Sequence, residues 1–263
     1  NSLHMPSPNT FNAKRIVHQL LSPPYFTTFE LPIIGTFSPK IFEGFKTLLR
    51  EDEEYQKLWT IQKPGLLQPD HGLIPPKGDG YDKKYFYHHS FDVPDILKER
   101  NISIEKYSEW LTTCDIFLHI FMQFGQQIID EFHRRPEFKK FNFPKFFEEG
   151  YLLHKIRLLK YLYEVDGVKN EILAQDHYDQ SAITFQWKQS HPGLYLGKRG
   201  ENPIPITGGC YDVTVFLGRK LAEATDGLLY KMPHYVDSPA DLNEDRYAGI
   251  CFIHTSHKIV EYK

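Results

Sequence analysis

The sequence predicts a mainly β protein whose first half carries helices. Before residue 135, two segments place apolar residues at the three-to-four-residue spacing of a helix that packs on one face. From Leu152 on, short segments rich in β-branched and aromatic residues alternate with Gly, Pro, Asn and Asp, which is typical of short strands joined by turns. We therefore expect a helical N-terminal region over residues 1–150 that packs on a β core over residues 151–263.

The first expected helix covers residues 38–58, after an irregular start that includes Pro23-Pro24. Ser38 is a suitable N-cap, and Pro39 suits the first helical position. The apolar residues of this segment fall on one face: Ile41, Phe45, Leu48 and Leu49.

A second, longer helix is expected over residues 103–134, and Pro136 should end it. Between the two helices, residues 62–95 contain many prolines and glycines and predict loops. Residues 70–92 within them are a candidate lid over a binding site, or else an ordinary exposed loop.

The second half predicts strands at residues 154–163, 181–187, 193–197, 204–207, 211–217, 228–236 and 247–254. Their shortness and frequent turn signals favour a sandwich or barrel over a parallel α/β sheet. Alternation along a strand places Phe185 and Trp187 on one side, and it leaves open whether that side is core or pocket.

Composition excludes several classes of function. The net charge of −3 gives no reason to expect binding to nucleic acid or to an anionic membrane. Three cysteines are too few and too scattered for a disulfide framework, so we expect a reducing cytoplasm. No apolar run is long enough to span a bilayer, and the start of the chain resembles a vector remnant ahead of Met5 rather than a signal peptide.

The most informative motif is His177-Tyr178-Asp179, followed much later by His234. In an extended segment, residues i and i+2 point to the same side, so His177 and Asp179 can converge on one ion. A histidine from another strand can complete the set. Two imidazoles and one carboxylate on one face are the ligands expected for non-haem Fe(II), with positions left for substrate and dioxygen.

The segments around these residues resemble the 2-oxoglutarate/Fe(II)-dependent dioxygenases of the isopenicillin N synthase and plant flavonoid-oxygenase type. Residues 175–184 match the segment that carries the first two ligands, and residues 192–196 are similar to the family's "PGLQV" strand. Residues 226–236 resemble the "NGRYKSVLHRV" strand with the distal ligand. Two earlier segments, residues 31–34 and 83–86, resemble the "IPVIDL" and "KEYF" segments more faintly.

The resemblance implies a double-stranded β-helix (jelly roll) core flanked by α-helices. His177, Asp179 and His234 would hold Fe(II), and 2-oxoglutarate would bind to that iron as cosubstrate. Its oxidative decarboxylation with dioxygen would release succinate and carbon dioxide, and a small organic substrate would be hydroxylated, desaturated or cyclised. No catalytic side chain beyond the metal ligands is implied.

Arg246 occupies the place of the arginine in the family's Arg-x-Ser motif, and it would bind the far carboxylate of 2-oxoglutarate through two parallel hydrogen bonds. The sequence departs from the motif at Ala248, where the family has serine. Tyr161 is a candidate to supply a phenol in place of the missing hydroxyl. Leu162 replaces the proline that usually follows this tyrosine.

Three alternatives stay open. The chain could be an oxidase of the same fold that does not use 2-oxoglutarate, a non-catalytic jelly-roll binding protein, or a hydroxylase of a protein or peptide. The oligomeric state is not predicted. Other groups are interpreted as structural or surface residues: the pair His88-His89, the pair His254 and His257, and Cys210 after two glycines.

Overall fold

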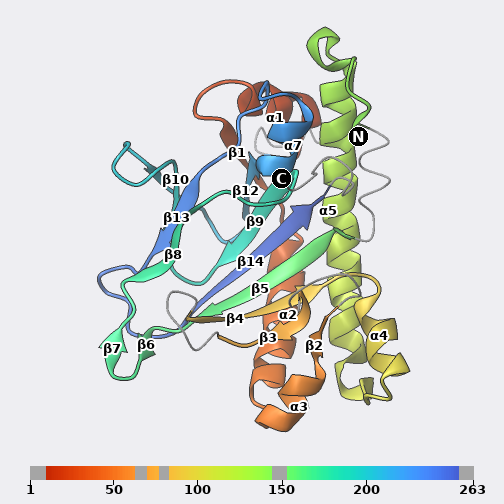
Figure 1. Cartoon of the computed structure of the whole chain (residues 1–263), viewed down its shortest axis with the longest axis vertical. Coiled ribbons are helices and arrows are strands. Elements are labelled where there is room, and N and C mark those ends of the chain that lie inside the picture. Colours follow the sequence, from red (N-terminus) through yellow and green to blue (C-terminus); the bar gives the residue numbers. More distant parts are fainter. Residues whose placement is uncertain (1–9, 63–69, 77–82, 144–152, 255–263) are drawn as a thin grey trace, which may run out of the picture.

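Two antiparallel sheets and a layer of helices form this protein, here in a computed structural model that describes residues 10–62, 70–76, 83–143 and 153–254 (Figure 1). The small sheet lies against one face of the large sheet, and the helix α5 (Ser108–Arg134) lies along the other face. The mainly β class with helices is confirmed.

The large sheet has eight strands among the described residues, and every neighbouring pair is antiparallel. In spatial order they are β1 (Phe26–Glu30), β12 (Asp212–Leu217), β9 (Ile183–Gln189), β14 (Arg246–Ile253), β5 (Lys155–Tyr161), β4 (Lys84–His89), β3 (His71–Ile74) and β2 (Thr60–Ile61).

The small sheet has the order β11 (Ile204–Pro205), β10 (Leu194–Leu196), β13 (His234–Asp237) and β8 (Ile172–His177). A separate hairpin joins β6 (Glu164–Val165) to β7 (Val168–Lys169). The strand β8 has no counterpart among the strands expected from the sequence, because its exposed polar end does not alternate with apolar residues.

The helices besides α5 are α1 (Ala13–Leu20), α2 (Ile34–Leu49), α3 (Glu53–Leu58), α4 (Val93–Glu99) and α7 (Arg219–Ala224). Short 3-10 turns, η1 (Glu105–Tyr107) and η2 (Pro136–Phe138), flank α5. The expected helix at residues 103–134 is therefore confirmed over most of its length. None of the helices in the described ranges has the length and apolar character needed to cross a membrane.

The expected single helix at residues 38–58 is wrong at its start and in its middle. The helix begins earlier, at Ile34, so Pro39 lies in its second turn rather than at its first position. The side chain of Ile34 is fully buried. The helix then breaks, and Asp52 begins α3 by accepting a 2.8 Å hydrogen bond from the backbone N–H of Tyr55. A new N-cap thus divides the segment into two helices.

The expected loop at residues 62–95 is also partly wrong. It contributes β3 and β4 to the large sheet and the helix α4 after them. The described part of the candidate lid at residues 70–92 is therefore mostly sheet, and residues 77–82 lie outside the described residues. The segment thus forms short strands despite its many prolines and glycines.

The expected boundary near residue 150 stays a prediction. Strands from both sides of it share the large sheet: β4 pairs with β5, and β1 pairs with β12. The N-terminal region therefore extends the sheet as well as covering it with helices.

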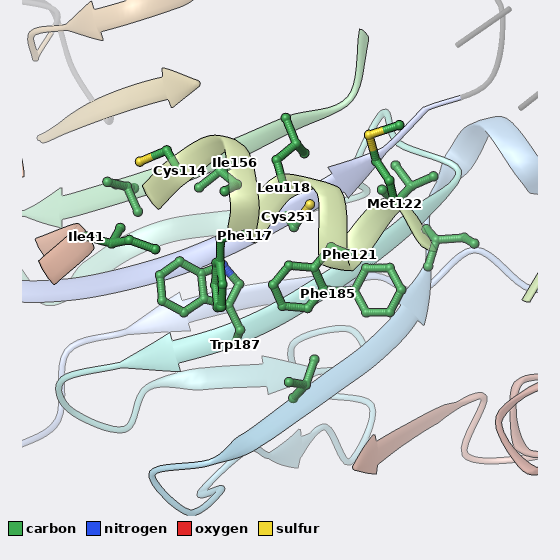
Figure 2. Packing of buried hydrophobic residues seen from close by; sticks show 14 of the residues in the cluster. Ile41, Cys114, Phe117, Leu118, Phe121, Met122, Ile156, Phe185, Trp187 and Cys251 are labelled. Carbon is green, nitrogen blue, oxygen red and sulfur yellow. The ribbon is translucent and has the colours of Figure 1, made fainter. Parts of the chain in front are cut away.

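Alternation along β9 separates the two faces of the large sheet. Phe185 and Trp187 face α5 (Figure 2). The ring centroid of Phe185 lies 5.2 Å from that of Phe121, and the ring centroid of Trp187 lies 4.6 Å from that of Phe117. These two residues are therefore core. A Cβ on Gly249 would come within 2.4 Å of the Trp187 ring, so glycine is needed there for the close approach.

The opposite face of the large sheet packs on the small sheet. A second apolar cluster lies between them, with Leu159 and Phe216 from the large sheet and Leu173, Leu194 and Val236 from the small sheet. The residues predicted to hold the metal and the cosubstrate (His177, Asp179, His234, Arg246 and Tyr161) lie on this side, between the two sheets.

Candidate metal centre

The three predicted ligands come together at one end of the small sheet. His177 is the last residue of β8, His234 is the first residue of β13, and the two are register partners. Asp179 lies two residues beyond β8, so its approach depends on the turn after the strand rather than on strand alternation. One ligand atom from each residue lies within 4.8 Å of the others.

The facing atoms are those that a metal would need. The Oδ1 atom of Asp179 lies 3.6 Å from Nε2 of His234 and 3.9 Å from Nε2 of His177. The centroids of the two imidazole rings are 4.2 Å apart. His234 and Asp179 are buried, whereas 42% of the His177 side chain is exposed, which opens the group to solvent on that side.

Backbone carbonyls select the tautomer of both imidazoles. Nδ1 of His177 lies 2.7 Å from the carbonyl oxygen of Gln175, and Nδ1 of His234 lies 3.2 Å from that of Met232. A carbonyl only accepts, so each Nδ1–H donates and each Nε2 keeps its lone pair. Both histidines therefore present an acceptor atom toward Asp179.

The remaining oxygen of Asp179 is held by the protein. The Thr184 hydroxyl donates a 2.7 Å hydrogen bond to Oδ2, and Thr184 lies 2.8 Å from the Ser181 hydroxyl. None of the described lysines and arginines forms an ion pair with this buried carboxylate. A divalent cation between Oδ1 and the two Nε2 atoms would supply the missing positive charge, so the residues fit a metal.

Electrostatics favour the neutral form of His177. Burial, and then the nearby His234, lower the pKa of His177 to about 4, although the Asp179 carboxylate acts in the opposite direction. The ring is thus neutral at pH 7, which is the form that binds a metal.

Arg246 lies on the same side of the large sheet, and it lines a cavity together with the three ligands. Its guanidinium is fully buried. Nε donates to the carbonyl oxygens of His191 (3.0 Å) and Pro192 (3.2 Å), and Nη2 donates to Oε1 of Gln189 (2.8 Å). Nη1 has no hydrogen-bond partner among the described residues, and no described carboxylate pairs with Arg246.

A buried cation without an anion is costly, so this arrangement is suited to an anionic ligand. Burial lowers the pKa of Arg246, but an arginine stays charged at neutral pH. The site thus offers a positive charge and an unpaired donor toward the same cavity as the three ligands.

Neighbouring residues determine the position of Arg246. Tyr161 is its register partner on β5, and the guanidinium carbon lies 5.3 Å from the centre of the tyrosine ring. Gly193 has a φ of +135°, and a Cβ there would lie 2.3 Å from the carbonyl oxygen of Asp237 and 3.5 Å from Nε of Arg246. Ala248 is buried on the same face as Arg246, so the position of the expected serine does face this side.

Several residues of the cavity were not predicted from the sequence. The polar ones among them are Lys84, Arg157, Thr184 and Gln186, all on strands of the large sheet. Alternation along β9 is a signal that could have found Thr184 and Gln186, since it places them opposite the core residues Phe185 and Trp187. No comparable signal marked β4, which was expected to be a loop.

The other described histidines and the three cysteines lie outside the metal group. His88 accepts a 2.7 Å hydrogen bond from Nε of Arg157, and His89 pairs with Asp115 at 2.7 Å on the opposite face. His257 lies outside the described residues. Cys210 is exposed in a turn before β12, and all three cysteines are free.

Comparison with known proteins gives a result for structures but not for sequences. No protein-family model matches the sequence, and no curated protein does so either. Solved structures do match. A full-length protein of Neurospora crassa, in complex with α-KG, is 17% identical, with a TM-score of 0.72 over 94% of this chain and 80% of that one.

Two further structures are similar to the same extent. The dioxygenase for auxin oxidation 1 of Arabidopsis thaliana, in a binary complex with 2-oxoglutarate, is 13% identical with a TM-score of 0.70, over 94% of this chain and 91% of that one. A protein of Caulobacter crescentus assigned to the 2OG-Fe(II) oxygenase family is 18% identical with a TM-score of 0.69, over 93% and 83%. This chain therefore has the fold of the 2-oxoglutarate–Fe(II) oxygenases, as the resemblance of its motifs predicted.

Proposed function

We propose that this protein is an Fe(II)- and 2-oxoglutarate-dependent oxygenase that hydroxylates, desaturates or cyclises a small organic substrate. The observation that carries the proposal is the convergence of His177, Asp179 and His234, with both Nε2 atoms and one carboxylate oxygen facing one another. Fold similarity at identities below 25% does not establish activity, so the function depends on this geometry.

His177, Asp179 and His234 would hold the iron. When bound, Fe(II) supplies open positions for the keto-acid and dioxygen and a route for oxidation of the substrate. The protein contributes the fixed tautomers of the histidines, the Thr184 hydrogen bond to Asp179, and the negative charge that partly neutralises the ion. These contributions hold the ligands in place before the metal arrives.

Arg246 would bind the far carboxylate of 2-oxoglutarate. Its unpaired Nη1 and its buried charge are the supporting observations, and similar structures contain α-KG or 2-oxoglutarate. Tyr161 would position Arg246 through the contact between its ring and the guanidinium. Decarboxylation of the cosubstrate would give succinate and carbon dioxide.

We include in the proposal that the two sheets form a double-stranded β-helix, with the site between them. Apolar side chains on the facing surfaces would keep water from the reacting groups. The three free cysteines agree with a reducing, cytoplasmic location.

A second candidate is an oxidase of the same fold that does not use 2-oxoglutarate. The observation in its favour is Ala248, which removes a hydroxyl donor from the face that carries Arg246. Since a hydrogen bond to a charged group contributes about 1.5–3 kcal/mol, its loss affects affinity for the cosubstrate.

The test combines binding with turnover. We expect the anaerobic wild type to bind one Fe(II) or Mn(II), and to bind 2-oxoglutarate in the presence of the metal. On addition of oxygen to the Fe(II)-loaded protein, succinate should form. Asp179→Ala should lose the metal, whereas Arg246→Gln should keep the metal and lose most of its affinity for 2-oxoglutarate.

Each failure has a different meaning. Absence of metal binding in a folded wild type would refute the oxygenase proposal. Metal binding without any binding of 2-oxoglutarate would instead favour the oxidase of the same fold.

A further inference from the structure

Three polar side chains of β9 form a row on the side of the large sheet that carries the metal ligands. Thr184 and Gln186 line the cavity with those ligands, as alternation along the strand requires. The register between β9 and β14 then shifts, and beyond the shift Gln189 turns to the same side, where it contacts Arg246.

The two outer members of the row are already committed to the site. Thr184 donates its 2.7 Å hydrogen bond to Asp179. Gln189 accepts the 2.8 Å hydrogen bond from Nη2 of Arg246, and its own amide nitrogen donates to a backbone carbonyl at 2.9 Å. The row therefore begins beside the metal ligands and ends beside Arg246, and Gln186 lies between these two ends.

Gln186 is the member of the row whose side chain has no partner. Only 7% of it is exposed, and no hydrogen bond joins its amide to another residue in the part of the chain that the structure describes. A buried amide without a partner is costly, and a ligand that pairs with it recovers that cost. The amide offers two N–H donors and one carbonyl acceptor.

The facing strand supplies no donor along this stretch. Ile250 is the register partner of Gln186, and Ala248 is the register partner of Gln189. Both side chains are apolar, and both lie on the side of β14 that carries Arg246. A ligand that extends from the metal ligands to Arg246 would therefore pass apolar side chains of β14 and the amide of Gln186.

We propose, on the premise of the function above, that Nε2 of Gln186 donates a hydrogen bond to a carboxylate oxygen of 2-oxoglutarate. Gln186 would then be a third contact to the cosubstrate, besides the metal and Arg246. A carboxylate only accepts hydrogen bonds, so the amide nitrogen is the atom that pairs with it. A hydrogen bond to a charged group is stronger than one between neutral groups, which favours this use of the amide.

Charge favours the metal side of Gln186 for an anionic ligand. Gln186 also lines a neighbouring cavity, which it shares with Thr214 and Asp212. The Asp212 carboxylate there accepts a hydrogen bond from the backbone N–H of Gly209 and would repel a second carboxylate. On the metal side, the buried guanidinium of Arg246 attracts one.

The experiment measures 2-oxoglutarate binding to the full chain loaded with Mn(II), by calorimetry in the absence of oxygen. Gln186→Met keeps the length of the side chain and removes the donor. We expect it to weaken 2-oxoglutarate binding by about 10- to 100-fold relative to the wild type. Gln186→Leu removes the donor with a different shape, should show a similar loss, and serves alone if the methionine variant does not fold.

Two controls separate the hydrogen bond from a general disturbance of the site. Mn(II) affinity without 2-oxoglutarate should be the same in both Gln186 variants as in the wild type, because Gln186 contacts none of the three metal ligands through a hydrogen bond. Thr214→Val is the matched variant, since Thr214 is the register partner of Gln186 on β12 but lines the neighbouring cavity. It should bind 2-oxoglutarate as the wild type does.

The inference is overturned if a folded Gln186→Met or Gln186→Leu variant binds 2-oxoglutarate as tightly as the wild type. It is also overturned if Thr214→Val loses as much affinity, or if Mn(II) binding alone weakens by the same factor, because either result would assign the loss to packing. Failure of the wild type to bind Mn(II) or 2-oxoglutarate is a different result, and it counts against the proposed function.

Discussion

The Thr184 hydroxyl donates a hydrogen bond of 2.7 Å to Oδ2 of Asp179, and the other carboxylate oxygen faces the two histidines. The two oxygens of this carboxylate thus have different roles. Since Thr184 gives its only proton to Asp179, the Ser181 hydroxyl must donate to Thr184, so both hydroxyls orient the carboxylate.

Thr184→Val should weaken metal binding. The substitution keeps the shape of the side chain and removes the donor to Oδ2, and loss of such a supporting hydrogen bond typically costs about 10- to 100-fold in metal affinity. Titration with Mn(II), followed by electron paramagnetic resonance, measures the effect. Thr184→Ser keeps the donor and should bind almost as the wild type does. Equal affinities for the valine and serine variants would contradict this role.

Ala248→Ser should strengthen binding of 2-oxoglutarate. The new hydroxyl would lie on the face that carries Arg246 and would add a donor to a charged carboxylate, worth about two- to tenfold in affinity after the cost of burial. Calorimetry on the Mn(II)-loaded protein measures the change. Ala174→Ser is the control, because Ala174 lines the same cavity from β8 on the small sheet. An unchanged or weaker affinity in Ala248→Ser would show that the cosubstrate carboxylate does not reach this position.

The imidazole of His177 should titrate near pH 4 in the metal-free protein. Its pKa is lowered in the native state, so between pH 6.5 and 4 the unfolded chain binds more protons than the native one. The contribution of His177 to stability is therefore present above pH 6.5 and is lost as the pH falls toward 4. An NMR titration, with His177→Gln to assign the signal, tests this. A midpoint near the usual 6.5 would contradict the effect of burial and of His234.

Gly193→Ala should destabilise the protein and disturb Arg246. The φ of +135° is unfavourable for alanine, and the new Cβ would lie 2.3 Å from the carbonyl oxygen of Asp237. We expect a loss of about 2–4 kcal/mol in the free energy of unfolding, measured by denaturant titration. Gly200→Ala separates the two causes, since its φ is +82° but nothing lies within 4 Å of the added Cβ. A similar loss in both variants would show that the backbone angle, and not the contact, sets the cost.

Local pattern in the sequence was enough for the class of the fold and for the three residues, His177, Asp179 and His234, that the structure brings together. The spacing of apolar residues predicted α5, because a helix that packs on a sheet must bury one face along its whole length. The flanks of His177, Asp179 and His234 carried the resemblance to a known family. Alternation along β9 placed Phe185 and Trp187 on one side, and it could not show which side faced the core.

The tertiary structure decided the rest, because the contacts involved join residues that are distant in the chain. Burial of Arg246 depends on β14 lying between β5 and β9, and on the turn that holds Gly193. Lys84 reaches the cavity only because β4 pairs with β5, although its segment has the composition of a loop. The sequence by itself thus determined which residues could bind a metal, whereas strand pairing determined which charges surround them.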